Sequence, residues 1–532
     1  MANLYPGVQT SRIPSGFRSI ATVGTSTTAF IGIFERGIVD KAIRITSWGQ
    51  FAAQFGGLWK HSDASYAVQH YFLNGGSVAY IVRTTWGSQD KKATVDLGAG
   101  AALGLTVTAK SEGIWGNDIH VGIADTGDTA TYDLLIREYD GEVIVAEEVY
   151  TGLSIAEGNP RFADRIVNKL STLVKVEGKD GKRPPNSLAN GDKTLKTLSA
   201  KDLTDVGTAL TGGHDGNVVN PDPGETISST IQDTIKTAIK GLDTARTGIY
   251  ALDDIVPDTF NLISIPVLGR LTKAKAKDIY TEAEAFCRKH YAFLLVDSND
   301  ATKANIYKDW FSEMGPAASE YAAGIFPRIS FEDPENLGKV RKMGASGVMA
   351  GLIAKTDANR GFFKAPAGIE TAFAGGDLEH SLTDLEHEPL NRSGVVCMRK
   401  FPVFGSINWG ARTLAGADDK ASEYKYISVA RTALVIEASL KRGLQWAVFE
   451  GNDEVLWGQI RLSVNAFMQT LHLKGAFQGS AASEAYFVKC DAETTTQADI
   501  DQGILNIVVG FAPLKPAEFV FIKLQQIVQA AT

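Results

Sequence analysis

The chain has 532 residues, of which 44% are hydrophobic and 21% are charged. This composition excludes a disordered protein and provides enough chain for about three or four packed units. The 53 lysines and arginines are outnumbered by 61 aspartates and glutamates, and the net charge of −8 argues against a protein that wraps nucleic acid.

The start of the chain and the cysteines predict a cytoplasmic protein. The sequence does not open with a basic segment followed by an apolar run, and it has no apolar stretch long enough to span a bilayer. We therefore expect a soluble protein that is not exported by a signal peptide. Cys287, Cys397 and Cys490 lie far apart, without the pairing of a disulfide framework or the close spacing of a zinc site, which fits a reducing compartment.

The first part of the chain carries the signals of a strand–helix–strand unit. The β-branched run Ala21–Val23 and the apolar run Ala29–Ile33 predict strands. A helix is predicted over Ala64–Leu73, because its apolar residues recur at helical spacing, and an Asn-Gly-Gly turn should end it. The buried-type strand Val78–Val82 follows.

Residues 91–225 are predicted to form an inserted, β-rich domain. Glycine, threonine and alanine become frequent there, and short alternating runs such as Leu105–Val107 and Asp118–Ile123 stand between turn signals. The cluster Gly98–Gly104 resembles a dinucleotide-binding loop only superficially, because its glycine spacing is wrong and a strand follows where a helix is needed. We interpret it as a flexible turn.

Further along, strands alternate with helices. The strands Leu262–Ile265 and Ala292–Val296 and the helix Lys273–Lys289 predict a mainly parallel α/β layer. The segment Gly351–Thr356 ends in the Lys-Thr of a phosphate-binding loop but lacks the glycine that must precede the lysine. We interpret this segment as the end of a strand.

Two long amphipathic helices are predicted in the C-terminal part, over Ser428–Gly443 and Asp453–Leu473, and we expect them to pack together. Asp453 is a natural N-cap for the second helix. The apolar stripe of the first helix consists of Val429, Ala433, Ile436 and Leu440, with Arg431, Glu437 and Lys441 off it; that of the second consists of Leu456, Ile460, Val464, Phe467 and Leu471.

The chain closes with two β-like runs, Leu505–Phe511 and Glu518–Leu524, which Pro513 and Pro516 separate. The second run is rich in β-branched and aromatic residues and precedes the last residues of the sequence. It is therefore a candidate for pairing with another strand.

No motif predicts catalysis, a metal or a cofactor. The densest group of metal-capable side chains matches neither a two-histidine zinc helix nor a calcium loop, and we interpret it as a solvated acidic helix or loop. It consists of Glu379, His380, Asp384, Glu386, His387 and Glu388. A second set, of aromatic residues, could form an interface patch but is expected to lie in the core. It comprises Phe401, Phe404, Trp409, Trp446, Phe449 and Trp457.

Several motifs follow one another along the chain. The N-terminal ones are Tyr5-Pro6-Gly7-Val8, Val23–Gly32, Ile45-Thr46-Ser47 with Phe51, Phe55-Gly56-Gly57, Tyr71–Gly76 and Gly113–Ile119. The later ones are Thr356–Gly361, Lys364–Ala367, Trp409–Leu414, Glu437–Glu450, Asn452–Glu454, Leu456-Trp457, Cys490-Asp491, Thr494–Gln497 and Val509–Phe519. Their order and spacing resemble the contractile tail sheath family of phages and phage-tail-like injection systems. No motif is recognised in residues 126–226, and Gly37-Ile38 stands where that family usually has Gly-Pro.

The resemblance implies an α/β (α+β) multidomain protein in which a sheath core of sheet and packed helices carries an outer domain and extended arms. The implied parts are an N-terminal linking arm (1–20), the first part of the sheath core (21–90), the inserted β-rich outer domain (91–225), a middle α/β domain (226–365), the second, tube-facing part of the core (366–505) and a C-terminal linking arm (506–532).

The function implied by the resemblance is structural and not enzymatic. Such a subunit polymerises as stacked hexameric rings around an inner tube and contracts to drive the tube through a target envelope, without cofactor or metal. The implied partners are further copies of the chain, the inner tube protein, and baseplate and terminal cap proteins, with no direct nucleic acid and no membrane insertion. The implied location is a virion tail or tail-like particle assembled in the bacterial cytoplasm.

The terminal arms of such proteins complete a small sheet in a neighbouring subunit, and two sets of residues here permit this. The residues expected to exchange strands are Tyr5, Pro6, Gly7 and Val8 at one end and Phe519, Val520, Phe521 and Ile522 at the other. We further expect Lys441, Arg442 and Arg461 to face the inner tube.

Two alternatives stay open at this point. The alternation of strands and helices also fits an α/β enzyme with an inserted β domain, although no convergent polar site is apparent. A different structural or binding component of a particle, such as a capsid or adhesin protein, shares the same cofactor-free profile.

Overall fold

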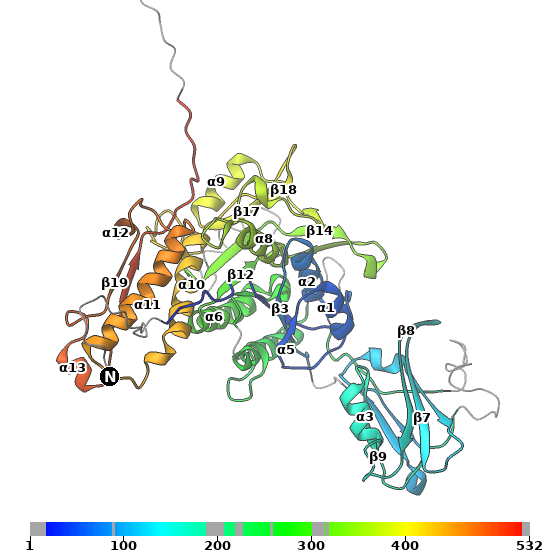
Figure 1. Cartoon of the computed structure of the whole chain (residues 1–532). Helices are drawn as coiled ribbons and strands as arrows, with labels where there is room; N and C mark the ends of the chain where they lie inside the picture. Colours follow the sequence, from blue (N-terminus) through cyan, green and yellow to red (C-terminus); the bar gives the residue numbers. More distant parts are fainter. Residues whose placement is uncertain are drawn as a thin grey trace, which may run out of the picture. The chain divides into compact units, whose positions relative to one another are not determined.

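The structure is a computed structural model that describes residues 18–87, 91–187, 207–218, 227–255, 259–299, 313 and 319–523. The fold is α/β, as predicted (Figure 1). Contacts divide the chain into two compact units. The central unit comprises Ser26–Lys355 and Pro366–Lys425, and the terminal unit comprises Met1–Thr25, Thr356–Ala365 and Tyr426–Thr532.

The central unit is built on an eight-stranded sheet. Its six inner strands are parallel, and an antiparallel strand closes each edge, which confirms the predicted mainly parallel layer. The order is β18 (Gly405–Asn408), β17 (Val395–Phe401), β13 (Ala322–Phe326), β12 (Phe293–Asp297), β11 (Leu262–Ser264), β1 (Thr28–Gly32), β3 (Ala79–Arg83) and β2 (Ile43–Ile45). This one sheet unites strands from three of the six predicted parts.

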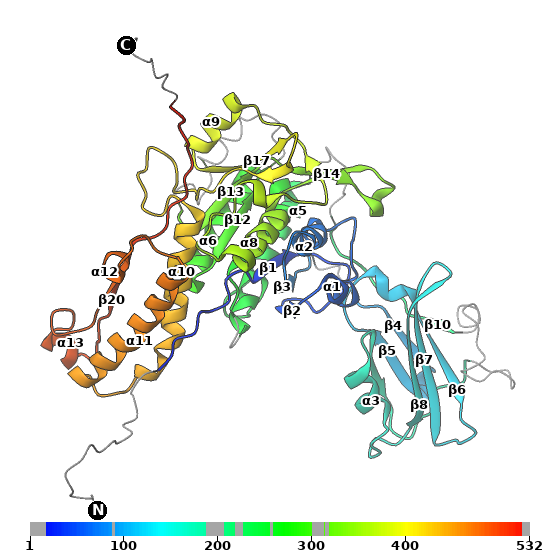
Figure 2. The ribbon, with the colours of Figure 1, turned by 45° about the horizontal axis from the view of Figure 1, so that its top comes forward.

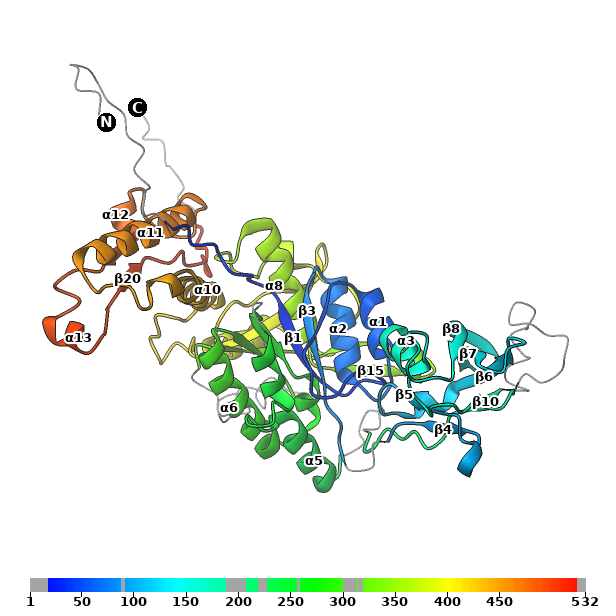
Figure 3. The same cartoon turned by 60° about the horizontal axis from the view of Figure 1, so that its bottom comes forward.

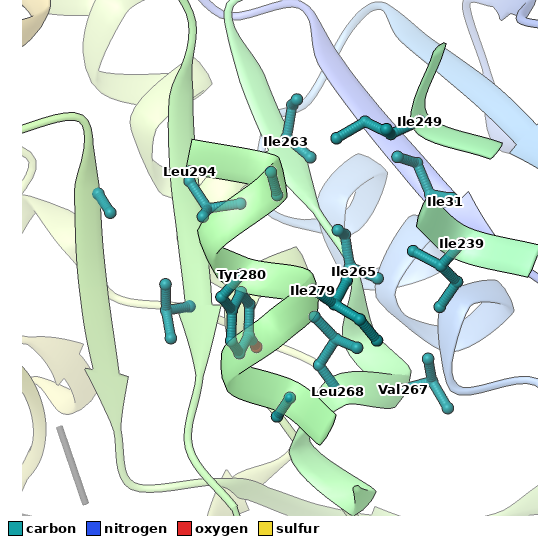
Figure 4. Packing of buried hydrophobic residues seen from close by; sticks show 14 of the residues in the cluster. Ile31, Ile239, Ile249, Ile263, Ile265, Val267, Leu268, Ile279, Tyr280 and Leu294 are labelled. Carbon is teal, nitrogen blue, oxygen red and sulfur yellow. The ribbon is translucent and has the colours of Figure 1, made fainter. Parts of the chain in front are cut away.

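Helices cover both faces of this sheet, which is why its parallel strands are continuous apolar runs. Helices α5 (Ser229–Lys240) and α6 (Lys273–His290) cover one face, while α1 (Trp48–Phe55), α2 (Asp63–Leu73) and α8 (Ser346–Arg360) lie on the other (Figure 3). Figure 4 shows the apolar layer under α5 and α6, where side chains of both helices meet those of β1, β11 and β12.

Helices α2 and α8 pack closely because α8 carries glycine where they meet. An added Cβ at Gly347 would lie 2.3 Å from the carbonyl oxygen of Ala67, and one at Gly351 would lie 2.8 Å from that of Tyr71. The interpretation of Gly351–Thr356 as a strand end is therefore wrong. Its glycine and alanine residues serve close helix packing within α8 rather than strand pairing.

The residues expected to be β-rich form two sheets around one apolar core. The first consists of β4 (Thr94–Leu97), β5 (Leu105–Ala109) and β9 (Val174–Gly178). The second consists of β10 (Thr208–Ala209), β6 (Ile119–Asp125), β7 (Thr131–Asp140) and β8 (Val143–Ser154), and α3 (Ala163–Leu170) packs on this core. The Gly98–Gly104 cluster forms the predicted turn, between β4 and β5.

A smaller sheet consists of β15 (Val340–Met343), β14 (Ile329–Glu332) and β16 (Asp377–Leu378), which precede and follow α8 in the sequence. The acidic segment after it forms α9 (Asp384–Arg392), as the sequence indicated. Glu379, however, is half-buried and ion-paired rather than solvated: the guanidinium of Arg328 donates to both of its carboxylate oxygens at 2.7 and 2.9 Å.

The terminal unit contains the two predicted long helices, α10 (Ile427–Gly443) and α11 (Glu454–Leu473), which share one apolar core and lie side by side in Figures 1 and 2. Asp453 caps α11, as predicted: its side chain accepts a hydrogen bond from the backbone N–H of Leu456. The unit also holds the short helices α12 (Ala482–Ala485) and α13 (Gln497–Asp501) and a two-stranded sheet of β19 (Tyr486–Lys489) and β20 (Val508–Phe511).

Several local predictions were wrong. Ala21–Val23 is extended but forms no strand, because backbone and side-chain groups of α10 and α11 are its neighbours rather than another strand. Of Leu505–Phe511, only Val508–Phe511 is a strand. The described part of Glu518–Leu524 has no regular structure. Arg431 is buried although it lies off the predicted apolar stripe.

The aromatic set expected in the core divides. Trp457 is buried, whereas Phe404, Trp409 and Phe449 are exposed, and Phe401 and Trp446 are half-buried. No helix among the described residues is both long and apolar enough to cross a membrane.

Candidate assembly surfaces

The two-stranded sheet of the terminal unit is the first candidate surface. Tyr486 pairs with Phe511 and Lys489 with Val508 in an antiparallel ladder. Two strands alone are marginal in water. This pair is stabilised because Tyr486, Val488 and Phe511 pack against the core under α11. Within the described part of the chain no third strand joins the sheet, so the pair offers backbone groups to strands from elsewhere.

Side chains of α11 hold β19 in place. The hydroxyl of Tyr486 donates to Oε1 of Gln469 at 2.9 Å. The guanidinium of Arg461 donates to the carbonyl oxygen of Cys490, the residue after β19. Arg461, which we expected at the tube-facing surface, is therefore half-buried and has a partner within its own unit. A bond across 29 residues could not be read from the local pattern.

The N-terminal chain enters the terminal unit over α10 and α11. The backbone N–H of Val23 donates to Oγ of Ser439 at 3.1 Å, and Ile20 is buried in the same core. The guanidinium of Arg18 lies 4.6 Å from the ring centroid of Trp446, a cation–π contact. These contacts anchor the chain from residue 18 onward. Tyr5, Pro6, Gly7 and Val8 lie outside the described residues.

The C-terminal chain leaves this unit at Glu518, whose Oε2 accepts a hydrogen bond from the hydroxyl of Tyr426 at 3.1 Å. Beyond it, Phe519, Val520, Phe521 and Ile522 are between 65% and 86% exposed. Four consecutive apolar side chains in water are costly, and such a segment marks an interaction site. The signal for this site in the sequence is the strand-like composition of the segment.

Lys441 and Arg442 are exposed in the last turn of α10, where cations interact favourably with the helix dipole. The loop that follows exposes Val448 and Phe449. The structure thus brings two of the three expected cations together on one surface turn and places the third, Arg461, under β19.

The carboxyl ends of parallel strands, where many α/β proteins bind ligands, are here occupied by the chain itself. Asp297 ends β12, and its buried carboxylate accepts hydrogen bonds from the backbone N–H of Ser346 at 2.7 Å and from its Oγ at 2.5 Å. Ser346 begins α8, so this carboxylate takes the place of an anionic ligand at a helix N-terminus. An added Cβ at Gly344 would meet the carboxylate at 2.1 Å.

Other reactive groups are similarly enclosed. Cys287, Cys397 and Cys490 are free thiols in buried positions, and burial raises the pKa of each. A thiol with a raised pKa is a poor nucleophile. Among the described residues, no three His, Cys, Asp or Glu side chains are arranged to hold a metal ion.

Comparisons with known proteins show two likenesses in sequence. Residues 419–527 match the family model of the phage tail sheath C-terminal domain. A putative prophage major tail sheath protein of Pseudomonas aeruginosa (strain UCBPP-PA14) is 27% identical over 188 residues, which are 34% of this chain and 44% of that protein. The aligned part therefore spans less than half of the relative's length.

Solved structures extend the likeness to the whole fold. The sheath complex of the extracellular contractile injection system PVC, in its contracted state, matches with a TM-score of 0.55 at 20% identity over 99% of both chains. The sheath tail protein of Listeria innocua matches with a TM-score of 0.59 at 14% identity over 93% of this chain and 96% of that one.

The fold is that of the sheath subunits of contractile tails and contractile injection systems. Within this fold, residues 419–527 are similar to the phage tail sheath C-terminal domain.

Proposed function

We propose that this chain is the repeating subunit of a contractile sheath, which polymerises as stacked hexameric rings around an inner tube and shortens to drive that tube through a target envelope. One observation carries the proposal: a strand-capable apolar segment, Phe519–Ile522, stands exposed in the same unit as a sheet of only two strands among the described residues. The segment lacks a strand to pair with, and the sheet has edges that can accept a strand.

The joint between subunits is a strand exchange. The segment Phe519–Ile522 of one subunit, and the segment Tyr5–Val8 of another, add to the β19–β20 pair of a third. Each new backbone hydrogen bond contributes about 0.5–1.5 kcal/mol net, and burial of the apolar side chains adds to this. Because donor and acceptor surfaces differ, the contact propagates as a helix instead of closing in a pair.

Contraction is a change between two packings of the same subunits. The arms stay paired while the folded units move and form new contacts, so no nucleotide hydrolysis is required. The extended sheath is held by a kinetic barrier and by contacts with the inner tube, and a trigger at one end releases it. Lys441 and Arg442 contribute salt-sensitive contacts to that tube. Arg461, whose guanidinium donates to the carbonyl oxygen of Cys490, supports β19 and makes no such contact.

The assembly also requires a baseplate that starts the sheath and a protein that ends it. Assembly takes place in the cytoplasm of the producing bacterium and yields a virion tail or a tail-like particle. The chain acts mechanically, with no catalytic residue, bound cofactor or metal.

The test is assembly of the purified full chain and of two truncated chains, one without residues 1–17 and one without residues 519–532. Electron microscopy should show hollow tubes or rings for the full chain. Both truncated chains should stay as single subunits with an unchanged circular dichroism spectrum. Tubes from either truncated chain that match those of the full chain would refute the strand exchange.

A further inference from the structure

The hairpin that joins β14 to β15 exposes a leucine at its tip. Leu337 is 96% exposed and has a φ of +54°, a left-handed conformation that side chains other than glycine and asparagine seldom adopt. Pro334 and Val340 on the same hairpin are exposed as well. Backbone strain and an exposed apolar side chain thus coincide at Leu337. This combination is typical of a contact site.

The turn itself is rigid. The backbone N–H groups of Asn336 and Gly338 both donate to the carbonyl oxygen of Asp333, at 3.2 and 2.9 Å, and the N–H of Asp333 donates to the carbonyl of Lys339 at 2.9 Å. The side chain of Asp333 also accepts from the backbone N–H of Glu335 at 3.0 Å. The position of Leu337 is therefore set by the turn.

A buried ion network fixes the base of the hairpin. Arg341 donates through Nε to Asp333 at 2.8 Å and through Nη1 to Asp63 at 2.7 Å. Its guanidinium also stacks over the ring of Tyr66, 4.2 Å from the centroid, and the Tyr66 hydroxyl donates to Asp333. Buried charges destabilise a fold unless each one is paired. The charges of Arg341, Asp333 and Asp63 are all paired here. The network positions a hairpin whose tip stands in water.

The chemistry of the tip selects the partner. Glu335 and Lys339 are both exposed and of opposite charge, so their charges cancel at the tip. Such a tip is not attracted to a polyanion or to a strongly basic surface. An apolar side chain ringed by both signs of charge matches an ordinary protein surface with an apolar pocket. In a polymer of identical subunits, every subunit presents such a surface to its neighbours.

We propose that the β14–β15 hairpin is a preformed contact through which one subunit docks on a second copy of the chain, with Leu337 as its anchor. This rests on the proposed sheath function. The contact is distinct from the strand exchange: it joins folded surfaces of central units and is heterologous, so it can repeat along a helix.

The experiment compares L337D with L385D. Leu385 in α9 is 84% exposed and serves as the matched control. Both aspartates stand in water in the single subunit, so both variants should fold with unchanged melting temperatures. L337D should raise the critical concentration for tube formation about tenfold or more, and L385D should leave it within about twofold of the wild type.

Two further variants separate the loss of the leucine side chain from the effect of an added charge. L337G removes the side chain and suits the positive φ, so it should weaken assembly while the single subunit keeps or gains stability. A photo-crosslinking amino acid at position 337 should join two sheath chains in tubes loaded on inner tube protein. Tubes of L337D at the wild-type critical concentration, or crosslinks to the inner tube alone, would overturn this inference. Failure of the wild-type chain to polymerise would instead overturn the proposed function on which it rests.

Discussion

Arg431 in α10 and Asp357 at the C-terminal end of α8 form a buried, two-pronged ion pair. The guanidinium nitrogens Nη1 and Nη2 lie 2.9 and 2.5 Å from the two carboxylate oxygens, and the side chains are 3% and 4% exposed. Nη2 also donates to the carbonyl oxygen of Thr25 at 2.8 Å. One guanidinium thus joins three segments of the terminal unit that are far apart in the sequence.

Replacing Arg431 with methionine should therefore destabilise the protein strongly. The R431M variant leaves the carboxylate of Asp357 buried without its partner, which typically costs about 3–5 kcal/mol in free energy of unfolding. Chemical denaturation of the single subunit measures the loss. In the double variant R431M/D357L no charge is left unpaired, and most of the lost stability should return. Replacing Lys489, whose contact with Glu493 at 3.9 Å is exposed, should change little. If R431M were as stable as the wild type, the Arg431–Asp357 pair would not be the stabilising contact described here.

The stability of the single subunit should fall as pH rises from about 5 to about 8. Burial raises the pKa of Asp297 to about 7, and burial also raises that of Glu35 to about 7. The unfolded chain, with carboxyl pKa values near 4, has already released these protons in this range. Because the folded state binds more protons than the unfolded state between the two values, raising the pH favours unfolding.

The D297N variant tests this pH dependence. Asparagine is similar in shape to the protonated carboxyl and can still accept from the N–H of Ser346, so it should fold, and the decline in stability between pH 5 and pH 8 should be shallower than in the wild type. Denaturation curves at the two pH values measure the slope. Equal slopes for the two proteins would show that Asp297 does not titrate in this range.

Charge reversal at the end of α10 should impair loading onto inner tubes. K441E/R442E replaces two exposed cations, so the salt-sensitive attraction to the tube should be lost while self-assembly continues. Co-sedimentation with inner tubes at low and moderate salt measures it. The matched control is R165E/K169E, which reverses two exposed cations on α3. If K441E/R442E loads onto inner tubes normally, Lys441 and Arg442 do not face the tube.

The C-terminal arm should show the two-residue period of a strand. Phe519 and Phe521 share one face of an extended chain, and Val520 and Ile522 share the other. After strand exchange only one face packs on the acceptor unit, so F519D/F521D and V520D/I522D should differ in critical concentration by about tenfold or more. Neither double variant should change the stability of the single subunit, because all four side chains are exposed there. Equal effects of the two double variants would contradict pairing as a strand.

Much of the fold was accessible from local patterns. The stripes that predicted α10 and α11 report which residues face a core, and Asp453 marked the start of α11 through its own capping bond. Alternation of strands and helices indicated the parallel sheet. The wrong prediction for Gly351–Thr356 shows what local patterns miss. Gly351 belongs to a helix because its missing side chain admits the backbone of α2, a contact between segments about 280 residues apart that no local window contains.

The sequence by itself indicated a resemblance to the contractile tail sheath family, and it determined the amphipathic helices of the terminal unit and the apolar, strand-like character of Phe519–Ile522. Only the tertiary structure decided that Arg431 pairs with Asp357, that Arg461 supports β19 and that Leu337 stands exposed at a rigid tip. Periodicity depends on neighbours along the chain, whereas the pairing of a charge or the exposure of a leucine depends on what folding brings within a few ångströms.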